Sequence, residues 1–213
     1  MVTFIENFYS NANQIYDIVS KLDYKQETFG LEIKDFYLVP QGIDSGFSQI
    51  VNKNIYLGKK SGCFRKPYEF IHFENFEPKS YFLAIVALTD TKFYTYRHKE
   101  KSYSQVIQLQ ENLEEFISKN CNNKSAWDIT CQVNMSPGDM VLVKPWLWHS
   151  IDPGIVNVFY LEITDQVVTD TSDQVVLSVK NEEQVENKEI QSDLMIGENV
   201  LPTPDFCSDK GTC

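Results

Sequence analysis

The sequence is poor in histidine and in basic residues, and it has no long hydrophobic run. It holds only 3 His, and 19 Lys and Arg stand against 30 Asp and Glu, which gives a formal net charge of −11. That charge repels the phosphates of nucleic acid and anionic lipid, so binding to nucleic acid or to a membrane is disfavoured. No apolar run reaches the roughly 18 residues of a membrane helix, and no export signal is visible at the start. We therefore expect a cytoplasmic protein.

Cysteine use excludes two further classes. The 5 cysteines are an odd number and none of them forms a Cys-x-x-Cys pair, which argues against a disulfide framework and against a structural zinc site. Hydrophobic residues make up 42% and aromatic residues 13% of the 213 residues, enough for one domain with a sizeable core.

The composition divides the chain in two. Residues 166–213 hold 10 acids and 3 bases and no aromatic residue except Phe206. Such a segment buries little apolar surface, so we expect it to be an acidic, extended or disordered tail that docks on a protein partner. The folded domain is expected to span residues 1–165.

The spacing of apolar residues predicts a mainly β domain with two helices. A helix capped at Asn11 or Asn13 is expected to end near Asp23, and residues 104–119 show a second, inserted helical stripe. Short apolar runs between turn formers predict antiparallel strands of a sandwich or barrel. These runs are Phe36–Val39, Ile50–Leu57, Tyr68–Phe76, Tyr81–Leu88, Lys92–His98, Trp127–Val133, Met140–Val143, Leu147–Ile151 and Ile155–Ile163.

The few histidines suggest a metal site. His72 and Glu74 stand at i and i+2 of a predicted strand, so their side chains share one face. His149 follows a Pro-Gly-Asp turn and an apolar strand that would return beside them. Two imidazoles and one carboxylate form the facial triad of non-haem Fe(II) enzymes, which leaves coordination positions open. The alternative is a buried His that is merely paired with a neighbouring Glu.

Several segments together resemble the 2-oxoglutarate/Fe(II) dioxygenase superfamily, in particular small bacterial and tailed-phage members. The resemblance covers about residues 1–163 and rests on Phe4–Asn11, Ile71–Phe76, Tyr81–Leu88, Phe93–Glu100, Trp127–Ile129, Pro137–Val143 and Leu147–Ser150. It implies a double-stranded β-helix, or jelly roll, with Fe(II) held by His72, Glu74 and His149. It also implies 2-oxoglutarate as cosubstrate, hydroxylation of a small-molecule or protein substrate, and a place in the host cytoplasm or virion for a phage-encoded protein.

Two residues depart from the superfamily pattern. Glu74 replaces the usual Asp, and the stretch 153–160 lacks the Arg that grips the distal carboxylate of 2-oxoglutarate. Arg97 is the candidate substitute, if it shares a face with Phe93 and Thr95, while Asn157 and Tyr160 are expected to line the cosubstrate pocket. An exposed strand end is the alternative for Arg97.

These departures keep three hypotheses open. The first is a non-haem Fe(II)/2-oxoglutarate-dependent dioxygenase. The second is a jelly-roll scaffold or binding protein that has lost the cosubstrate anchor, with a virion-associated or assembly role. The third is a cupin-like metalloprotein with other chemistry, because a jelly roll hosts many functions.

Overall fold

The computed structural model describes residues 2–74, 80–106, 109 and 112–163. All of them belong to one of the two compact units of the chain, Met1–Thr164 with Gly211–Cys213. The other unit, Asp165–Lys210, and with it the expected tail at 166–213, lies outside the described residues. No helix in the described part of the chain is long and apolar enough to cross a membrane.

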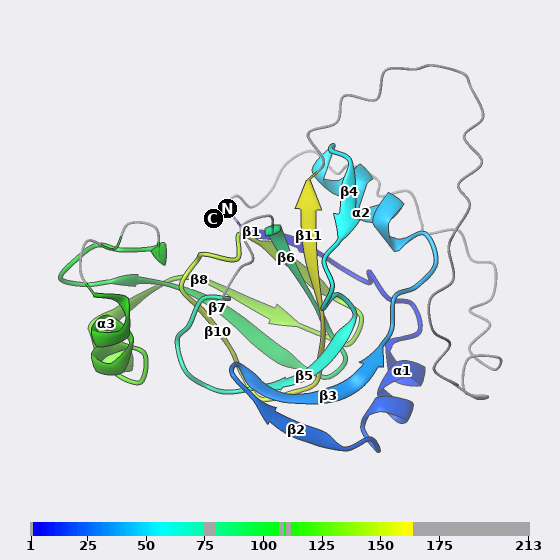
Figure 1. Ribbon diagram of the computed structural model, residues 1–213, viewed down its shortest axis with the longest axis horizontal. Helices are drawn as coiled ribbons and strands as arrows, with labels where there is room; N and C mark the ends of the chain where they lie inside the picture. Colours follow the sequence, from blue (N-terminus) through cyan, green and yellow to red (C-terminus); the bar gives the residue numbers. More distant parts are fainter. Residues whose placement is uncertain (1, 75–79, 107–108, 110–111, 164–213) are drawn as a thin grey trace, which may run out of the picture. The chain divides into compact units, whose positions relative to one another are not determined.

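Two antiparallel sheets form the body of this unit (Figure 1). The large sheet has the order β1-β9-β6-β11-β5-β3-β2, with β4 also paired to β11, and the small sheet has the order β10-β7-β8. The strands are β1 (Val2–Ile5), β2 (Tyr24–Glu27), β3 (Gly30–Tyr37), β4 (Ile55–Leu57), β5 (Cys63–Pro67), β6 (Ser80–Ala87), β7 (Thr91–His98), β8 (Trp127–Met135), β9 (Met140–Val143), β10 (His149–Ile151) and β11 (Val156–Ile163).

The path of the chain between the sheets is that of a double-stranded β-helix. From β5 the chain passes to the small sheet at His72, which bridges His149 of β10, and then back to β6. It continues through β7 and β8 of the small sheet, β9 of the large sheet, β10 of the small sheet and β11 of the large sheet. The mainly β jelly roll expected from the sequence is therefore confirmed.

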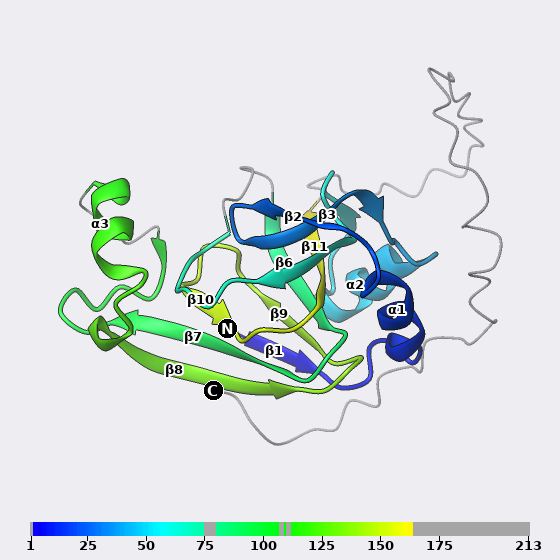
Figure 2. The same ribbon diagram turned by 90° about the horizontal axis from the view of Figure 1, so that it is seen from below.

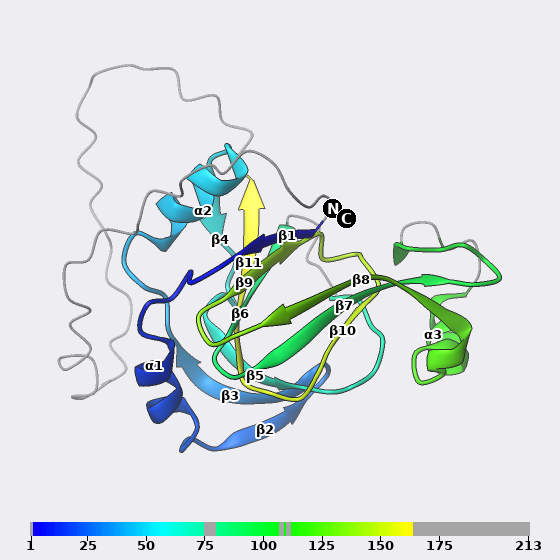
Figure 3. The ribbon, with the colours of Figure 1, turned by 180° about the vertical axis from the view of Figure 1, so that it is seen from behind.

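Apolar side chains pack on both faces of the large sheet. Strand alternation directs one face into the roll, where residues of both sheets pack together, among them Ile85, Phe93 and Val158. The opposite face packs against helices α1 (Ala12–Val19) and α2 (Ile43–Val51) through side chains that include Ile15 and Phe47. Figure 3 shows both helices beside the large sheet, and Figure 2 shows β7 and β8 running together along the other side.

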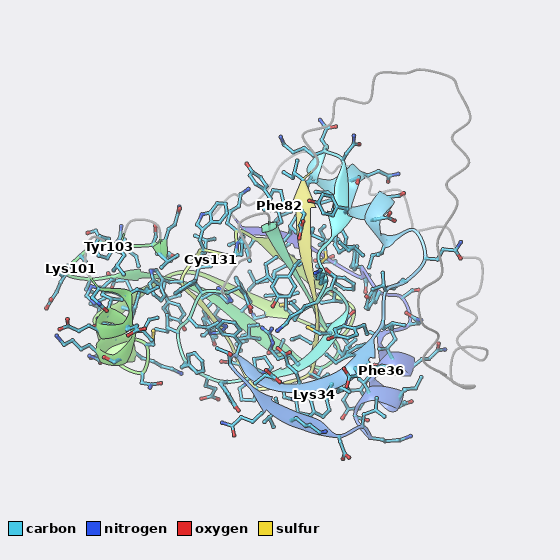
Figure 4. The ribbon with its side chains drawn as sticks, in the orientation of Figure 1. Lys34, Phe36, Phe82, Lys101, Tyr103 and Cys131 are labelled. Atoms are coloured by element: carbon cyan, nitrogen blue, oxygen red, sulfur yellow. The ribbon has the colours of Figure 1, made fainter. Side chains whose placement is uncertain are left out.

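A side-chain cap starts helix α3 (Leu113–Asn120) but not helix α1. α1 starts after Asn11, but the Asn11 side chain makes no capping hydrogen bond, and the helix ends at Val19, short of the expected Asp23. α3 starts at Asn112, whose Oδ1 accepts a hydrogen bond from the Glu115 N–H at 3.1 Å. Its buried residue Phe116 packs near Tyr103, which Figure 4 shows beside α3.

Two sequence expectations were wrong in detail. The inserted helix covers Leu113–Asn120 and not residues 104–119, since Gln105 forms a β-bridge with Leu147. The stretch Ile50–Leu57 contains the end of α2 and only a short strand, β4. α2 arises because Gly42, with φ +75°, starts a helix whose residues Ile43 and Phe47 face the core.

The strand expected at Tyr68–Phe76 is also different. β5 ends at Pro67, whose ring has no N–H to continue the ladder, and the following described residues contain only the bridge at His72. His72 and His149 exchange backbone hydrogen bonds, with N to O distances of 2.8 and 2.7 Å. The position of His72 is thus fixed by its partner strand and not by a long strand of its own.

Candidate metal centre

Three side chains from two distant segments converge inside the roll. One ligand atom from each of His72, Glu74 and His149 lies within 4.8 Å of the other two. The His72–His149 bridge brings the two rings to a centroid distance of 4.6 Å. The Glu74 N–H donates to the Pro145 carbonyl at 3.0 Å, which fixes Glu74 beside the segment that leads into β10. The convergence expected from the sequence is therefore observed.

The two imidazoles are oriented by the backbone. Nδ1 of His72 lies 2.9 Å from the Phe70 carbonyl, and Nδ1 of His149 lies 2.8 Å from the Leu147 carbonyl. Because a carbonyl only accepts, each Nδ1 carries the proton and each Nε2 is left with a lone pair. Both Nε2 atoms are buried and lack a hydrogen-bond partner among the described residues. This is the arrangement in which a histidine coordinates a metal ion through Nε2.

Burial keeps both imidazoles neutral. Desolvation and then the nearby His149 lower the pKa of His72 from 6.5 to about 3. Desolvation also lowers the pKa of His149. Aromatic rings enclose the pair: Phe29 stacks on His72 at 5.1 Å and Phe93 stacks on His149 at 5.5 Å, centroid to centroid. Neutral imidazoles are the form that binds metal, so the site needs no deprotonation of histidine near neutral pH.

Glu74 carries the negative charge of the site. Burial by itself would raise the pKa of this carboxyl, but the charge and the hydrogen bond of the Arg65 guanidinium lower it below its usual value. Arg65 Nη1 donates to Glu74 Oε1 at 2.5 Å, and the Tyr160 hydroxyl donates to Glu74 Oε2 at 2.9 Å. Glu74 is 1% exposed, so this is a buried carboxylate held by two donors.

Sequence reasoning missed Arg65. It stands on β5, is 2% exposed, and also donates from Nε to Glu32 at 2.8 Å. The contact with Glu32 follows from the β3–β5 register, in which these two residues are direct partners. No short motif marks such a pairing: Arg65 lies between the apolar pair Cys63–Phe64 and the charged Lys66, so the sequence does not distinguish it from an exposed base.

Arg97 does not have the position expected of it. A register shift between Thr95 and Tyr96 of β7 reverses the alternation of faces, so that Thr95, Tyr96 and His98 are buried and Arg97 is exposed. The expectation that Arg97 shares the inner face with Thr95 is therefore wrong. Its register partner on β8 is Asp128.

The two expected lining residues of β11 are separated by strand alternation. Tyr160 faces the site and contacts both Glu74 and Arg65. Asn157 faces the helix-covered side, where it accepts from the Tyr9 hydroxyl at 2.8 Å and donates to the Cys63 carbonyl at 3.0 Å. Asn157 is fully buried with these bonds, and its expected place in the cosubstrate pocket is wrong.

The chemistry of the donor set suits a divalent transition metal. Two neutral imidazole nitrogens and one carboxylate supply three ligands and one negative charge, which is typical of Fe(II) sites with open coordination positions. The buried Nε2 atoms without partners are the observation that a metal ion would explain, because buried polar atoms are otherwise bonded. The residues present therefore fit a metal ion.

No protein-family model matches the sequence, and no curated protein matches it. The chain is similar in structure to HygX from Streptomyces hygroscopicus, at 12% identity and over 77% of its own length. For the structure with nickel, 2-oxoglutarate and hygromycin B bound, the TM-score is 0.48 and the match covers 83% of HygX. For the structure with nickel and 2-oxoglutarate bound, the TM-score is 0.44 and the match covers 83% of HygX. For the structure with iron bound, the TM-score is 0.43 and the match covers 82% of HygX. The strand order defines the fold of this chain as a double-stranded β-helix, and the geometry of His72, Glu74 and His149 defines its candidate metal centre.

Proposed function

We propose that this chain is a non-haem Fe(II)- and 2-oxoglutarate-dependent dioxygenase that hydroxylates a small-molecule or protein substrate. The observation that carries the proposal is the convergence of His72, Glu74 and His149 with both imidazole Nε2 atoms buried and free of hydrogen bonds. Three protein ligands leave room at an Fe(II) ion for a bidentate 2-oxo acid and for oxygen.

Each residue of the centre has a distinct task. His72 and His149 present Nε2 to the metal, and their Nδ1–H bonds to backbone carbonyls prevent the rings from turning. Glu74 supplies the third ligand and offsets part of the metal charge. Phe29 and Phe93 cover the rings and exclude water. Iron with 2-oxoglutarate supplies the oxidising chemistry when both are bound.

The test is an anaerobic titration of the full chain with Fe(II) and 2-oxoglutarate. We expect the weak visible charge-transfer band of the iron chelate, with one metal ion retained per chain. The variant His149→Asn should lose both the band and the metal. The matched control is His98→Gln, because His98 is also buried but already bonds to Asn120 at 3.2 Å. A chain that retains no metal and shows no band would refute the dioxygenase.

One observation favours the scaffold hypothesis as the second candidate. Both oxygens of Glu74 already accept hydrogen bonds, from Arg65 and from Tyr160, as they would in a purely structural ion pair. In that reading the roll keeps the fold without chemistry and the acidic segment 166–213 binds a protein partner. Metal analysis of the purified protein separates the two candidates, since a structural pair retains no stoichiometric metal.

A further inference from the structure

The chain makes a tight turn at residues 144–147, between β9 and β10, and we call it the ligand turn. The Leu147 N–H donates to the Lys144 carbonyl at 3.1 Å, which closes a β-turn. Pro145 stands at the second position, where its fixed φ suits such a turn. The ligand turn therefore has a defined backbone that can position its other carbonyl groups.

The ligand turn orients two of the three candidate metal ligands. Its Pro145 carbonyl accepts from the Glu74 N–H at 3.0 Å. Its Leu147 carbonyl lies 2.8 Å from Nδ1 of His149. Groups that orient metal ligands from behind typically change metal affinity about 10–100-fold when they are lost. A shift of the ligand turn would therefore displace both ligands and weaken the centre.

The side chain of Lys144 connects the ligand turn to three aromatic rings. Its Nζ lies 3.0 Å from the ring centroid of Tyr81, 3.8 Å from that of Phe82 and 5.4 Å from that of Trp146. We call these three rings the aromatic platform. A cation at such distances is attracted by the faces of aromatic rings. Because Tyr81 and Phe82 stand near the start of β6, these contacts tie the ligand turn to that strand.

The register of β6 and β9 explains why these side chains meet. Leu83 of β6 is the antiparallel partner of Val143, the last residue of β9. One residue further out, Phe82 and Lys144 therefore stand across from each other. Strand pairing that is already part of the roll thus brings the cation to the rings.

The aromatic platform holds the charge of Lys144 without help from an acid. Among the residues that the structure describes, no carboxylate forms an ion pair with Lys144. The charge that acts on it is the like charge of Lys53. Burial and then Lys53 lower the pKa of Lys144 to about 8, so the ammonium is still the main form at pH 7. The rings therefore set the position of this cation.

We propose that Lys144 is a positioning residue of the metal centre: its ammonium, held on the aromatic platform, fixes the ligand turn and thereby the geometry in which Glu74 and His149 meet a metal ion. The inference deepens the proposed function and rests on its metal site. Lys144 is not itself a ligand, and it acts through the carbonyls of Pro145 and Leu147. Removing its charge should leave the roll folded and should weaken metal binding.

The first test measures Co(II) binding to the full chain by calorimetry. Lys144→Met keeps a flexible apolar side chain but loses the charge. We expect it to raise the Kd of Co(II) at least about fivefold, which corresponds to about 1 kcal/mol and to one partly exposed cation–π contact. Lys144→Arg keeps a cation that stacks on aromatic rings and should bind within about twofold of the unaltered chain. The matched control Lys92→Met removes an exposed lysine of β7 and should leave the Kd unchanged.

A double-mutant cycle assigns the effect to the aromatic platform. Tyr81→Leu removes the ring nearest to Nζ and should raise the Kd of Co(II) to a similar extent. Lys144→Met combined with Tyr81→Leu should be little weaker than either single variant, because each of them already removes the same contact. If Lys144→Met does not fold, Tyr81→Leu gives the same test, since Tyr81 is 40% exposed. Two effects that multiply in the double variant overturn the contact as their cause.

Amide hydrogen exchange tests the positioning in the metal-free protein. The Glu74 N–H, which donates to the ligand turn, should exchange at least about fivefold faster in Lys144→Met when followed by NMR. The Ala87 N–H is the internal reference, because it donates to the Asp139 carbonyl at 2.8 Å at the other end of β6. Its exchange rate should change less than about twofold, whereas a general loss of stability would raise both rates.

The outcomes separate this inference from the proposed function. Tight Co(II) binding that changes less than about twofold in Lys144→Met overturns the positioning role and leaves the dioxygenase standing. Equal acceleration of both amides, or an equal loss of affinity in Lys144→Arg and Lys144→Met, also overturns it. Absence of Co(II) binding in the unaltered chain overturns the proposed function, and the exchange of the Glu74 amide then still decides whether Lys144 holds the ligand turn.

Discussion

Removing Arg65 should destabilise the metal-free protein strongly. Arg65→Met keeps much of the apolar stem but removes the charge that holds Glu74 and Glu32. Glu74 is 1% exposed, so water cannot replace the lost donor, and Glu32 has only 13% of its side chain exposed. Breaking a buried ion pair from one side costs about 3–5 kcal/mol. For a domain of this size, that loss corresponds to a fall in Tm of roughly 6–20 °C.

The measurement is urea unfolding of the metal-free variant, followed by tryptophan fluorescence. Arg97→Met is the matched control: Arg97 is exposed on β7, so its loss should change the free energy of unfolding by less than about 0.5 kcal/mol. Arg65→Met combined with Glu74→Met should regain part of the loss, because the fully buried charge of Glu74 is then gone and only Glu32, with 13% of its side chain exposed, lacks its partner. A loss below about 1 kcal/mol for Arg65→Met would refute the reasoning, since Glu74 would then have to be protonated or solvated without Arg65.

Three further predictions concern pH, a turn and a core hydrogen bond. The free energy of unfolding of the metal-free protein should fall as pH drops below about 6.5. The unfolded chain protonates His72 near its ordinary pKa, whereas burial and then His149 lower the folded pKa to about 3. The free energy of unfolding from urea titrations between about pH 7 and pH 5 should change with a slope that approaches about 1.4 kcal/mol per pH unit for His72, and a free energy that does not change over this range would contradict the reasoning. Gly138→Ala should lower the free energy of unfolding in urea by about 1–3 kcal/mol, because φ is +99° and an added Cβ would contact the Tyr9 carbonyl oxygen. An unchanged urea midpoint would contradict this backbone strain. Asn157→Ala should lower the free energy of unfolding by about 1–3 kcal/mol, because the buried Tyr9 hydroxyl and Cys63 carbonyl lose their hydrogen-bond partner. The variant should keep the band of Fe(II) with 2-oxoglutarate. Loss of the band in a folded variant would show that Asn157 lies in the cosubstrate pocket.

The strand pattern was readable because strands that are buried on both faces show up as short apolar runs between turn formers. β9 has the predicted bounds Met140–Val143, and β11 differs from its prediction by one residue. The helix α2 was not readable, because Asp44-Ser45-Gly46 is equally compatible with a turn. It became a helix because Ile43 and Phe47 find an apolar sheet face to cover.

The positions of Arg97 and Asn157 show where alternation fails as a guide. A single register shift at Thr95 and Tyr96 turns Arg97 outward, and such a bulge leaves no mark in the composition of the strand. Asn157 lies in a run of apolar residues and is buried as expected of that run, but the sequence does not tell which of two buried faces it joins. The register of β11 places Asn157 on the helix-covered side, away from Tyr160, and there it accepts a hydrogen bond from the Tyr9 hydroxyl.

The amino-acid sequence by itself determined the mainly β fold and the three metal-ligand candidates, because residue type and periodicity are local properties. Only the tertiary structure decided what surrounds those candidates. Arg65 contacts Glu32 because β3 lies beside β5, and it contacts Tyr160, 95 residues away in the chain, because β11 lies on the other side of β5. Glu74 is held beside them by the hydrogen bond of its N–H to the Pro145 carbonyl. The electrostatics of the centre thus depends on strand register, which is set by the cooperative packing of the whole roll and not by any single segment.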